Sequence, residues 1–519
     1  MIKLEIVNGS LQISNGGSVI LVAPKNSCAI DVLALYDATS FIVIYNKYLG
    51  NSTNVFTQPL ANCEDGTSTP FTVNSFIAFA ETNLGFDTSG GGSSPFRYDT
   101  NATGIEPCLG SNNASGVYST IGGGNGNNAT DYFSTVGGGQ GNTASSTCST
   151  IGGGYCNIAS NGGATIGGGV LNNASGTNST ISGGTYNFAF ISRSTVGGGL
   201  RNYSSNLYST IGGGGYNTSS GVKATISGGY FNIATGCCST IGGGVNNNAT
   251  GSSSTIGGGN TNTINPSQNI GGANPYIGDV INGGCDNVIN TNTYCAPNVT
   301  GGNVIGGGCG NIVTPYGSGF STIGGGKGNT ACLDFSTVGG GVLNIASGVA
   351  STIGGGANNI SSNNDSTVGG GSYNTASSND STVGGGKSNI SSGSFSTVGG
   401  GYINSATCNW STVGGGAYNI ASGGNSVIAG GRYNTASGYY SAILGGKDNT
   451  ASGACSGILS GYSNNINNFP EAMIVGSNIT ADRACATFVN NLSIKNIPTS
   501  SAGLPSGSVW KNGNVLNIV

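Results

Sequence analysis

The sequence predicts an all-β protein whose main body is a parallel β-solenoid (β-roll) of 15-residue coils. Three observations indicate this fold class: the motif Ser-Thr-Ile/Val-Gly-Gly-Gly returns every 15 residues, 100 of the 519 residues are Gly, and only 6% are charged. Ordinary domains contain about 25% charged residues and roughly 7% Gly. Repetition at a fixed period is typical of solenoids, in which each repeat stacks on its neighbours.

The composition excludes the two other common explanations of a Gly-rich chain. Collagen needs Gly at every third residue and abundant Pro, whereas this chain has Gly triplets and 12 Pro in all. Disorder is favoured by high net charge and few apolar residues. Here the net charge is -4 and 36% of the residues are hydrophobic, so a repeat scaffold is the better interpretation.

The repeats form two arrays of ten units. The first starts at Ser119 and continues at 15-residue intervals to Ser254, and the second runs from Ser321 to Ser456. We number the positions of a coil from 1 to 15, starting at this Ser or at the Ala that replaces it. Position 3 is then Ile or Val, position 9 is Asn, and position 11 is usually Ala or Ser.

Each recurring residue type has a physical reason. Ile or Val at position 3 suits a strand whose alternate side chains point inward, and Thr at position 2 then points outward. The Gly triplet permits positive φ and a close approach of stacked backbones. Asn at position 9 tolerates left-handed backbone, and stacked Asn side chains can hydrogen-bond from coil to coil. Two sets of residues follow from this interpretation.

The predicted coil core includes Ile121, Val136, Ile151, Ile166, Ile181, Ile323, Val338, Ile353 and Val368. The predicted structural Asn ladder consists of Asn127, Asn142, Asn157, Asn172, Asn187, Asn202, Asn217, Asn232, Asn247, Asn262, Asn329, Asn344, Asn359, Asn374, Asn389, Asn404, Asn419, Asn434 and Asn449.

Five segments are predicted along the chain. Short β runs at Leu4–Val7, Ser18–Ala23 and Phe41–Tyr45 indicate a small N-terminal β domain. The irregular middle keeps two coil cores, each with the usual spacing of six from Ile to Asn, at Ile281 and Ile305. The segments are 1–100 (attachment domain or cap), 104–268 (first array), 269–320 (irregular coils with projecting loops), 321–470 (second array) and 471–519 (C-terminal β cap or tail).

A single coil of this size buries little apolar area, which is barely enough to offset the conformational entropy that the chain loses on folding. We therefore expect several chains to associate, and a homotrimer is the predicted assembly. The residues available between chains are the aromatic side chains at positions 7 and 8 and the Ile or Thr at position 10. If about twenty coils stack at roughly 4.8 Å each, the stack is on the order of 100 Å long.

Motifs that could provide catalytic or metal-binding residues are sparse. The chain has no His, so the usual general base of a nucleophilic triad is missing, and the 18 Asp and Glu are scattered. We predict no enzymatic activity, no cofactor and no metal site. Fourteen Cys occur without a CxxC spacing and are expected to be mostly buried small residues or free thiols, with Cys285 and Cys295 the first pair to test for a bond.

The charge pattern and the hydropathy limit which binding partners and which cellular location can be expected. The 14 Lys and Arg are spread singly, so nucleic acid is not an expected partner. There is no run of 18 apolar residues, so no membrane insertion is expected. The first residues lack the pattern of a secretory signal, which predicts synthesis in a cytoplasm.

Two resemblances refine the functional expectation. Over roughly 104–470 the repeat resembles the head domains of trimeric autotransporter adhesins, which implies left-handed parallel β-rolls. The signal, stalk and membrane barrel of those adhesins have no counterpart here. The stretch Ile497-Pro-Thr-Ser-Ser-Ala-Gly-Leu-Pro-Ser-Gly-Ser-Val-Trp510 and the residues after it look like the C-terminal tails of phage and large-virus structural proteins.

These resemblances imply a fibre or decoration protein on a virion surface, made in the host cytoplasm and held by other virion proteins. Contact with a host-surface glycan or protein would use exposed aromatic residues or the loops of 269–320. The alternatives are a self-assembling extracellular filament or matrix protein and an ice-binding solenoid, although the repeat offers only one dependable Thr row. The candidate receptor residues are Phe133, Trp410, Tyr439 and Tyr440.

Overall fold

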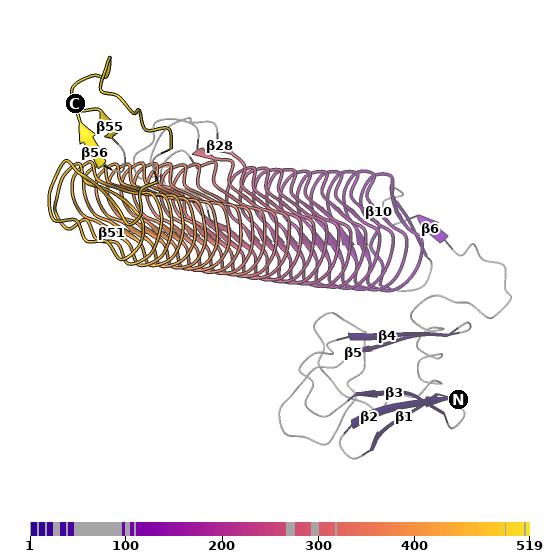
Figure 1. Cartoon of the computed structure of the whole chain (residues 1–519). Helices are drawn as coiled ribbons and strands as arrows, with labels where there is room; N and C mark the ends of the chain where they lie inside the picture. The colour runs from indigo at the N-terminus through magenta and orange to yellow at the C-terminus, as the bar shows by residue number, and fades with distance from the viewer. Residues whose placement is uncertain are drawn as a thin grey trace. The chain divides into compact units, whose positions relative to one another are not determined.

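A computed structural model of the chain confirms the all-β class and the parallel β-solenoid, with about 23 turns at a spacing of about 15 residues (Figure 1). Before residue 108 it describes the strands β1 to β7, and beyond that point residues 111–265, 276–291, 300–316, 319–493, 495–512 and 515–519. The chain divides into two compact units. The first consists of Met1–Pro266 and Gly278–Gly284, and the second consists of Ser267–Ile277 and Cys285–Val519.

Each regular coil contributes two short parallel strands and one isolated β-bridge. Positions 2 and 3 form the first strand, as in β10 (Thr135–Val136), and positions 10 and 11 form the second, as in β11 (Thr143–Ala144). Position 7 bridges to position 7 of the next coil, as Gln140 does to Tyr155. Identical positions pair because the register equals one repeat, so Val136 lies beside Ile151.

In the first unit, the first-strand sheet begins with an antiparallel pair, β6 (Phe96–Tyr98) and β7 (Gly104–Pro107). β7 pairs in parallel with β8 (Ser119–Ile121), and the sheet continues coil by coil through β26 (Thr255–Ile256) to β29 (Val280–Ile281). The second-strand sheet runs from β9 (Asn128–Ala129) to β27 (Thr263–Asn265). The antiparallel pair covers a strand edge that would otherwise be open.

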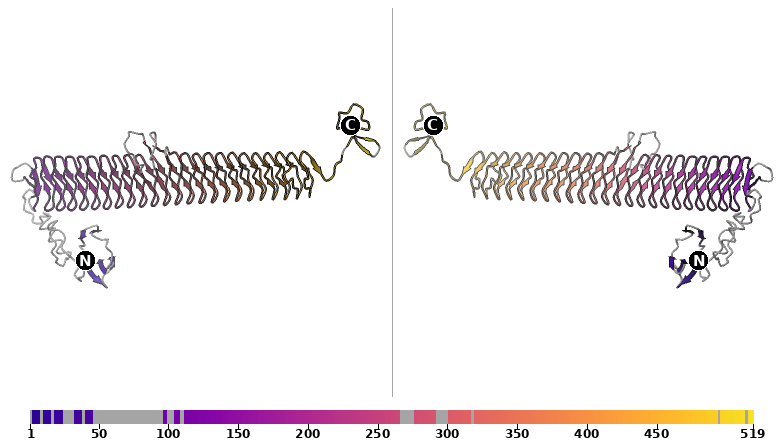
Figure 2. Two further views of the ribbon diagram at one scale, coloured as in Figure 1. Left: turned by 90° about the vertical axis from the view of Figure 1, so that its left-hand side faces the viewer. Right: turned by 90° about the vertical axis from the view of Figure 1, so that its right-hand side faces the viewer.

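In the second unit, the first-strand sheet runs from β32 (Val304–Ile305) to β52 (Gly457–Ile458). It continues with β53 (Met473–Val475) and β54 (Thr487–Val489), which lie in the segment expected to form a cap. The second-strand sheet runs from β30 (Val288–Asn290) through β33 (Ile312–Val313) to β51 (Thr450–Ala451). Figure 2 shows the short strands of successive coils lying side by side within each unit.

Four smaller sheets complete the described fold. β1 (Ile2–Val7), β2 (Ser10–Asn15) and β3 (Ser18–Ala23) form an antiparallel sheet, and β4 (Val32–Asp37) pairs with β5 (Ser40–Tyr45). In the irregular middle β28 (Tyr276–Ile277) pairs with β31 (Thr300–Gly301). Near the end of the chain β55 (Val509–Asn512) and β56 (Val515–Ile518) form an antiparallel pair.

The core of each coil is one large and one small apolar side chain. The side chains at position 3 are fully buried, as for Ile121 and Ile353, and so are those at position 11, such as Ala129 and Ala376. Thr at position 2 is half-buried on the outer side of the same strand. β-branched residues suit this pleated, one-side-buried geometry. The nine core residues predicted from the repeat are all fully buried.

Candidate functional site: the asparagine ladder and the coil surface

The Asn at position 9 links three coils through one side chain. In Asn172, the amide Nδ2 donates to the carbonyl O of Gly168 in its own coil (3.0 Å) and of Gly184 in the next coil (2.9 Å). Its Oδ1 accepts from the backbone N–H of Asn187 (3.0 Å), and its own N–H donates to Oδ1 of Asn157 (3.0 Å). The side chain thus satisfies backbone groups that turn inward at this corner, as buried polar groups require.

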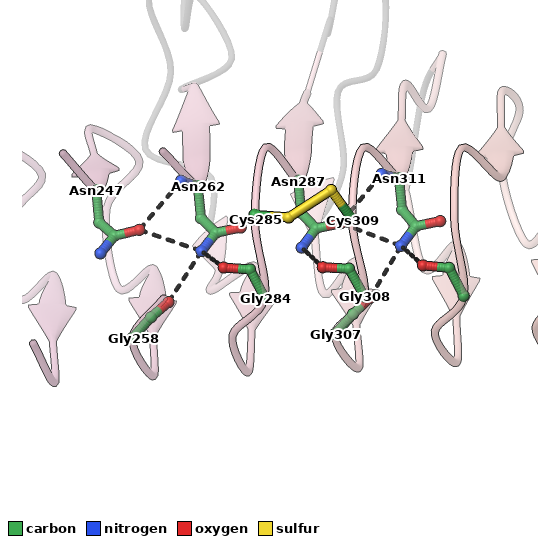
Figure 3. The surroundings of a disulfide bond; sticks show 11 residues. Asn247, Gly258, Asn262, Gly284, Cys285, Asn287, Gly307, Gly308, Cys309 and Asn311 are labelled. Carbon is green, nitrogen blue, oxygen red and sulfur yellow. Dashed lines mark hydrogen bonds between the residues drawn. A yellow bond between two sulfur atoms is a disulfide. The ribbon is translucent and has the colours of Figure 1, made fainter. Parts of the chain in front are cut away.

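This arrangement recurs in both units. All nineteen Asn predicted for the ladder are completely buried. In the first unit the ladder also includes Asn112, which accepts from the N–H of Asn127. The irregular coils supply Asn287 and Asn311 (Figure 3). Asn464 extends the ladder of the second unit by accepting from the N–H of Ile479.

The left-handed backbone of each coil lies elsewhere than expected. None of the ladder Asn has a positive φ, which corrects the expectation that position 9 is left-handed. Apart from Gly of the triplet, the residues of the regular coils with positive φ are at positions 8 and 15, where φ is +54° at Tyr186 and +58° at Arg193. Such angles are unusual for bulky residues. The backbone of these turns is held by neighbouring coils, because the N–H of Arg193 donates to Thr177 O (2.8 Å) and that of Tyr186 to Val170 O (3.0 Å).

The third Gly of the triplet, at position 6, is the one that the coil geometry requires. In Gly356 φ is +93°, and a Cβ there would overlap the carbonyl O of Gly371 in the next coil. The second Gly of the same triplet, Gly355, has open space around a Cβ. The first position of the triplet is occupied by Ser182, Ala429 and Leu444 in other coils, so its Gly is dispensable.

Ser at position 1 closes the turn between coils. The hydroxyl of Ser209 donates to Asn206 O (2.7 Å), and the N–H of Asn206 donates back to the Ser209 hydroxyl (3.1 Å). Where position 11 carries Ser and the next position 1 is also Ser, the two hydroxyls meet, as for Ser204 and Ser209 at 2.7 Å. The hydroxyl of Ser219 donates instead to the backbone O of Ala224 (3.0 Å). A polar residue at position 11 is therefore tolerated because position 1 supplies its partner.

One disulfide joins neighbouring coils in the irregular middle, between Cys285 and Cys309 (Figure 3). The expectation that Cys285 pairs first with Cys295 was wrong, and Cys295 itself lies outside the described residues. Both bonded Cys occupy position 7, two residues before Asn287 and Asn311, and their Cα atoms are 4.6 Å apart. Stacking places identical positions at the short separation that a disulfide needs.

Seven other described Cys are free thiols outside the core, whereas Cys156 is buried and disulfide-bonded. Cys148, Cys237, Cys238, Cys455 and Cys485 are exposed. Cys332 and Cys408 are half-buried. Free thiols agree with the expectation, but these Cys are not buried small residues of the core.

The four candidate receptor residues are on the surface and 48% to 56% exposed. Trp410 has one ring face covered by Phe395 of the preceding coil, with centroids 4.2 Å apart and planes at 7°. Phe133 is covered in the same way by Tyr118 (5.2 Å, 18°). These rings stack coil on coil, so each presents an edge and one remaining face to a partner.

Tyr439 and Tyr440 meet each other edge to face, with centroids 4.4 Å apart, as Tyr132 and Phe133 do at 4.3 Å. The hydrogen bond with Tyr439 raises the pKa of the Tyr440 phenol. Arg432 lies over the rings of Tyr418 and Tyr433, at 5.9 Å and 4.7 Å from their centroids. The turns therefore carry cation–π and aromatic contacts that support the neighbouring coil.

Among the described residues, one group of at least three potential metal ligands has its ligand atoms within 4.8 Å of one another: Cys285, Asp286 and Cys309. The two sulfur atoms are joined in the disulfide and are not available as thiolates. No helix in the described part of the chain is long and apolar enough to span a membrane. No known protein family and no curated protein matches this sequence.

Proposed function

We propose that this chain is a structural fibre or decoration protein of a virion surface that works as an assembly of several copies. The observation that carries the proposal is the ladder of buried Asn. It fixes each coil to the next through backbone acceptors and donors, so a unit of stacked coils is stiff without needing a large core. The similarity of the last residues to tails of viral structural proteins favours a virion over a cell surface.

The solenoid interior gives no reason for association, because positions 3 and 11 are fully buried within one chain. The outer face of the second-strand sheet does give one. No residue at position 10 or 12 of the described coils is charged. In the second unit, the Ile residues of position 10 are 37% to 43% exposed. This position-10 stripe consists of Ile312, Ile345, Ile360, Ile390 and Ile420.

An uncharged stripe rich in β-branched side chains is the kind of surface that copies of one chain bury against each other. A homotrimer accommodates it, since three copies can each cover the stripe of a neighbour. Charged residues of the regular coils lie in the turns instead, as Lys387 and Arg432 do at position 7. A host glycan or protein would accordingly be contacted by the turns, which carry the exposed aromatic rings.

The test compares the wild-type chain with Ile360→Asp combined with Ile390→Asp, by mass photometry. We expect trimers of the wild type and monomers of the variant, because two carboxylates on the stripe would have to be desolvated in the interface. The matched control is Thr367→Asp with Thr397→Asp on the other sheet, which should remain trimeric. A monomeric wild type, or equal dissociation of both variants, would refute the trimer.

Electron microscopy of the same preparation tests the fibre. Particles of one length support a capped fibre, whereas open polymers would show the filament alternative. The ice-binding alternative is less favoured by the surface, because Thr forms a row only at position 2 and the position-10 row is interrupted by Ile, Phe and Tyr.

A further inference from the structure

Cys237 and Cys238 form a pair of adjacent thiols on the outer turn of one coil. They occupy positions 14 and 15, both are free and exposed, and their sulfur atoms are 3.7 Å apart. Neither contributes to the coil core, and the corresponding positions of the next coil are Ser252 and Ser253. The pair therefore has no packing role that would account for two Cys in sequence.

The backbone of the pair is held in place by the coils on both sides. The N–H of Cys238 donates to Val222 O (2.8 Å) in the preceding coil, and Cys237 O accepts from the N–H of Ser253 (2.7 Å) in the following coil. Cys238 is left-handed, with a φ of +57°. Because these contacts belong to the stacked coils, the two Cβ atoms are presented on a fixed support.

The sulfur separation matches that of two thiolates on one tetrahedral metal ion. A Zn–S bond is about 2.3 Å, so two ligands at the tetrahedral angle are roughly 3.8 Å apart. We infer that Cys237 and Cys238 are a bidentate site for a thiophilic divalent cation such as Zn²⁺ or Cd²⁺, with water in the remaining coordination positions. Two thiolates would balance the charge of the ion, and each thiol releases its proton on binding.

Oxidation of the pair to a disulfide is the competing reaction, and the geometry disfavours it. Cα atoms across a trans peptide are 3.8 Å apart, whereas disulfides usually join Cα atoms separated by about 4.4 to 6.8 Å. The hydrogen bond with Cys238 and burial raise the pKa of the Cys237 thiol, against the opposite effect of the Lys223 ammonium in the preceding coil.

Cadmium titration of the full chain, followed by the ultraviolet thiolate-to-cadmium charge-transfer band, tests the site. Cys237→Ser and Cys238→Ser should each weaken binding at least tenfold. Ser is compatible with both turn positions, since Ser253 has a φ of +55° at position 15. The matched controls are Cys148→Ser and Cys455→Ser, which remove single exposed thiols at position 15 of other coils and should leave the titration unchanged.

Absence of the band in the wild type would overturn the inference. So would a band that persists in Cys237→Ser and Cys238→Ser, or one that the control variants reduce equally. Far-ultraviolet circular dichroism of each variant shows that the coils are intact, so a lost band reports the thiols and not unfolding.

Discussion

At the scale of single residues, the coil depends on two positions at which no other residue type can replace the one present. Asn at position 9 supplies one acceptor and two donors inside a corner that holds several inward-facing backbone groups. Gly at position 6 supplies a positive φ and an approach to the next coil that leaves no space for a Cβ. Most of the variation between coils is at positions that face solvent, although the buried position 11 also varies.

Gly356→Ala is expected to destabilise the second unit by at least about 2 kcal/mol, because Ala is strained at this φ and its Cβ would collide with the backbone of the next coil. Gly355→Ala, one residue earlier in open space, should change the free energy of unfolding by less than about 1 kcal/mol. The free energies of unfolding of the two variants are compared by guanidinium denaturation. Equal destabilisation would show that the triplet acts only through chain flexibility.

The repeat spacing was sufficient to identify the inward and outward residues. Ile or Val at position 3 and the small residue at position 11 recur at intervals that only a constant coil length explains, and both are buried. The left-handed positions could not be predicted in this way. Positions 8 and 15 carry Asn and Asp in some coils but Tyr, Arg, Phe or Lys in others, and the latter have no intrinsic preference for positive φ. Neighbouring coils impose the conformation on them through hydrogen bonds.

At the scale of elements, the irregular middle keeps the coil and changes only its length. Cys285 and Cys309 are 24 residues apart in sequence, whereas equivalent residues of regular coils are 15 apart. A longer connection costs more entropy to close, and the disulfide removes part of that cost from the unfolded state. The pair could have been identified from the sequence, because both Cys precede a ladder Asn by two residues.

Replacing both Cys285 and Cys309 by Ser is expected to destabilise the second unit by about 3 kcal/mol, the value for a closed loop of this length. Cys332→Ser, which removes a half-buried free thiol of the same unit, should change stability by no more than about 0.5 kcal/mol. The measurement is the guanidinium midpoint without reductant. If adding a thiol reductant to the wild type leaves the midpoint unchanged, the bond contributes nothing to stability.

The N-terminal strands show a different limit of prediction. The apolar runs that become β1, β3 and β5 were identified, but β2 and β4 were not. β2 has the sequence Ser-Leu-Gln-Ile-Ser-Asn, in which only two residues are apolar. Its place in the sheet comes from pairing with both β1 and β3, and such tertiary pairing outweighs local propensity.

At the scale of the whole molecule, stability is expected to come from neighbouring coils and not from one large core. Each coil buries one large and one small side chain, and its polar groups are satisfied largely by the coils before and after it. In repeat proteins of this kind, damage to one repeat spreads to its neighbours. The same property lets the outer surface vary from coil to coil, so exposed stripes and turns can evolve partners without disturbing the fold.

The measurement that tests the ladder most directly is native-state hydrogen exchange of Asn172→Ala, with Asn173→Ala as the control. Asn173 is the next residue, at position 10, and its Oδ1 has no hydrogen-bond partner. Losing the Asn172 side chain leaves the carbonyl of Gly168 and the N–H of Asn187 without partners and removes one of the two donors to the carbonyl of Gly184, at a cost of about 2 kcal/mol or more. We predict faster exchange in the coils on both sides of Asn172 and wild-type exchange in Asn173→Ala. Unchanged exchange in Asn172→Ala, or equal acceleration in both variants, would contradict the claim that the buried Asn fixes each coil to the next.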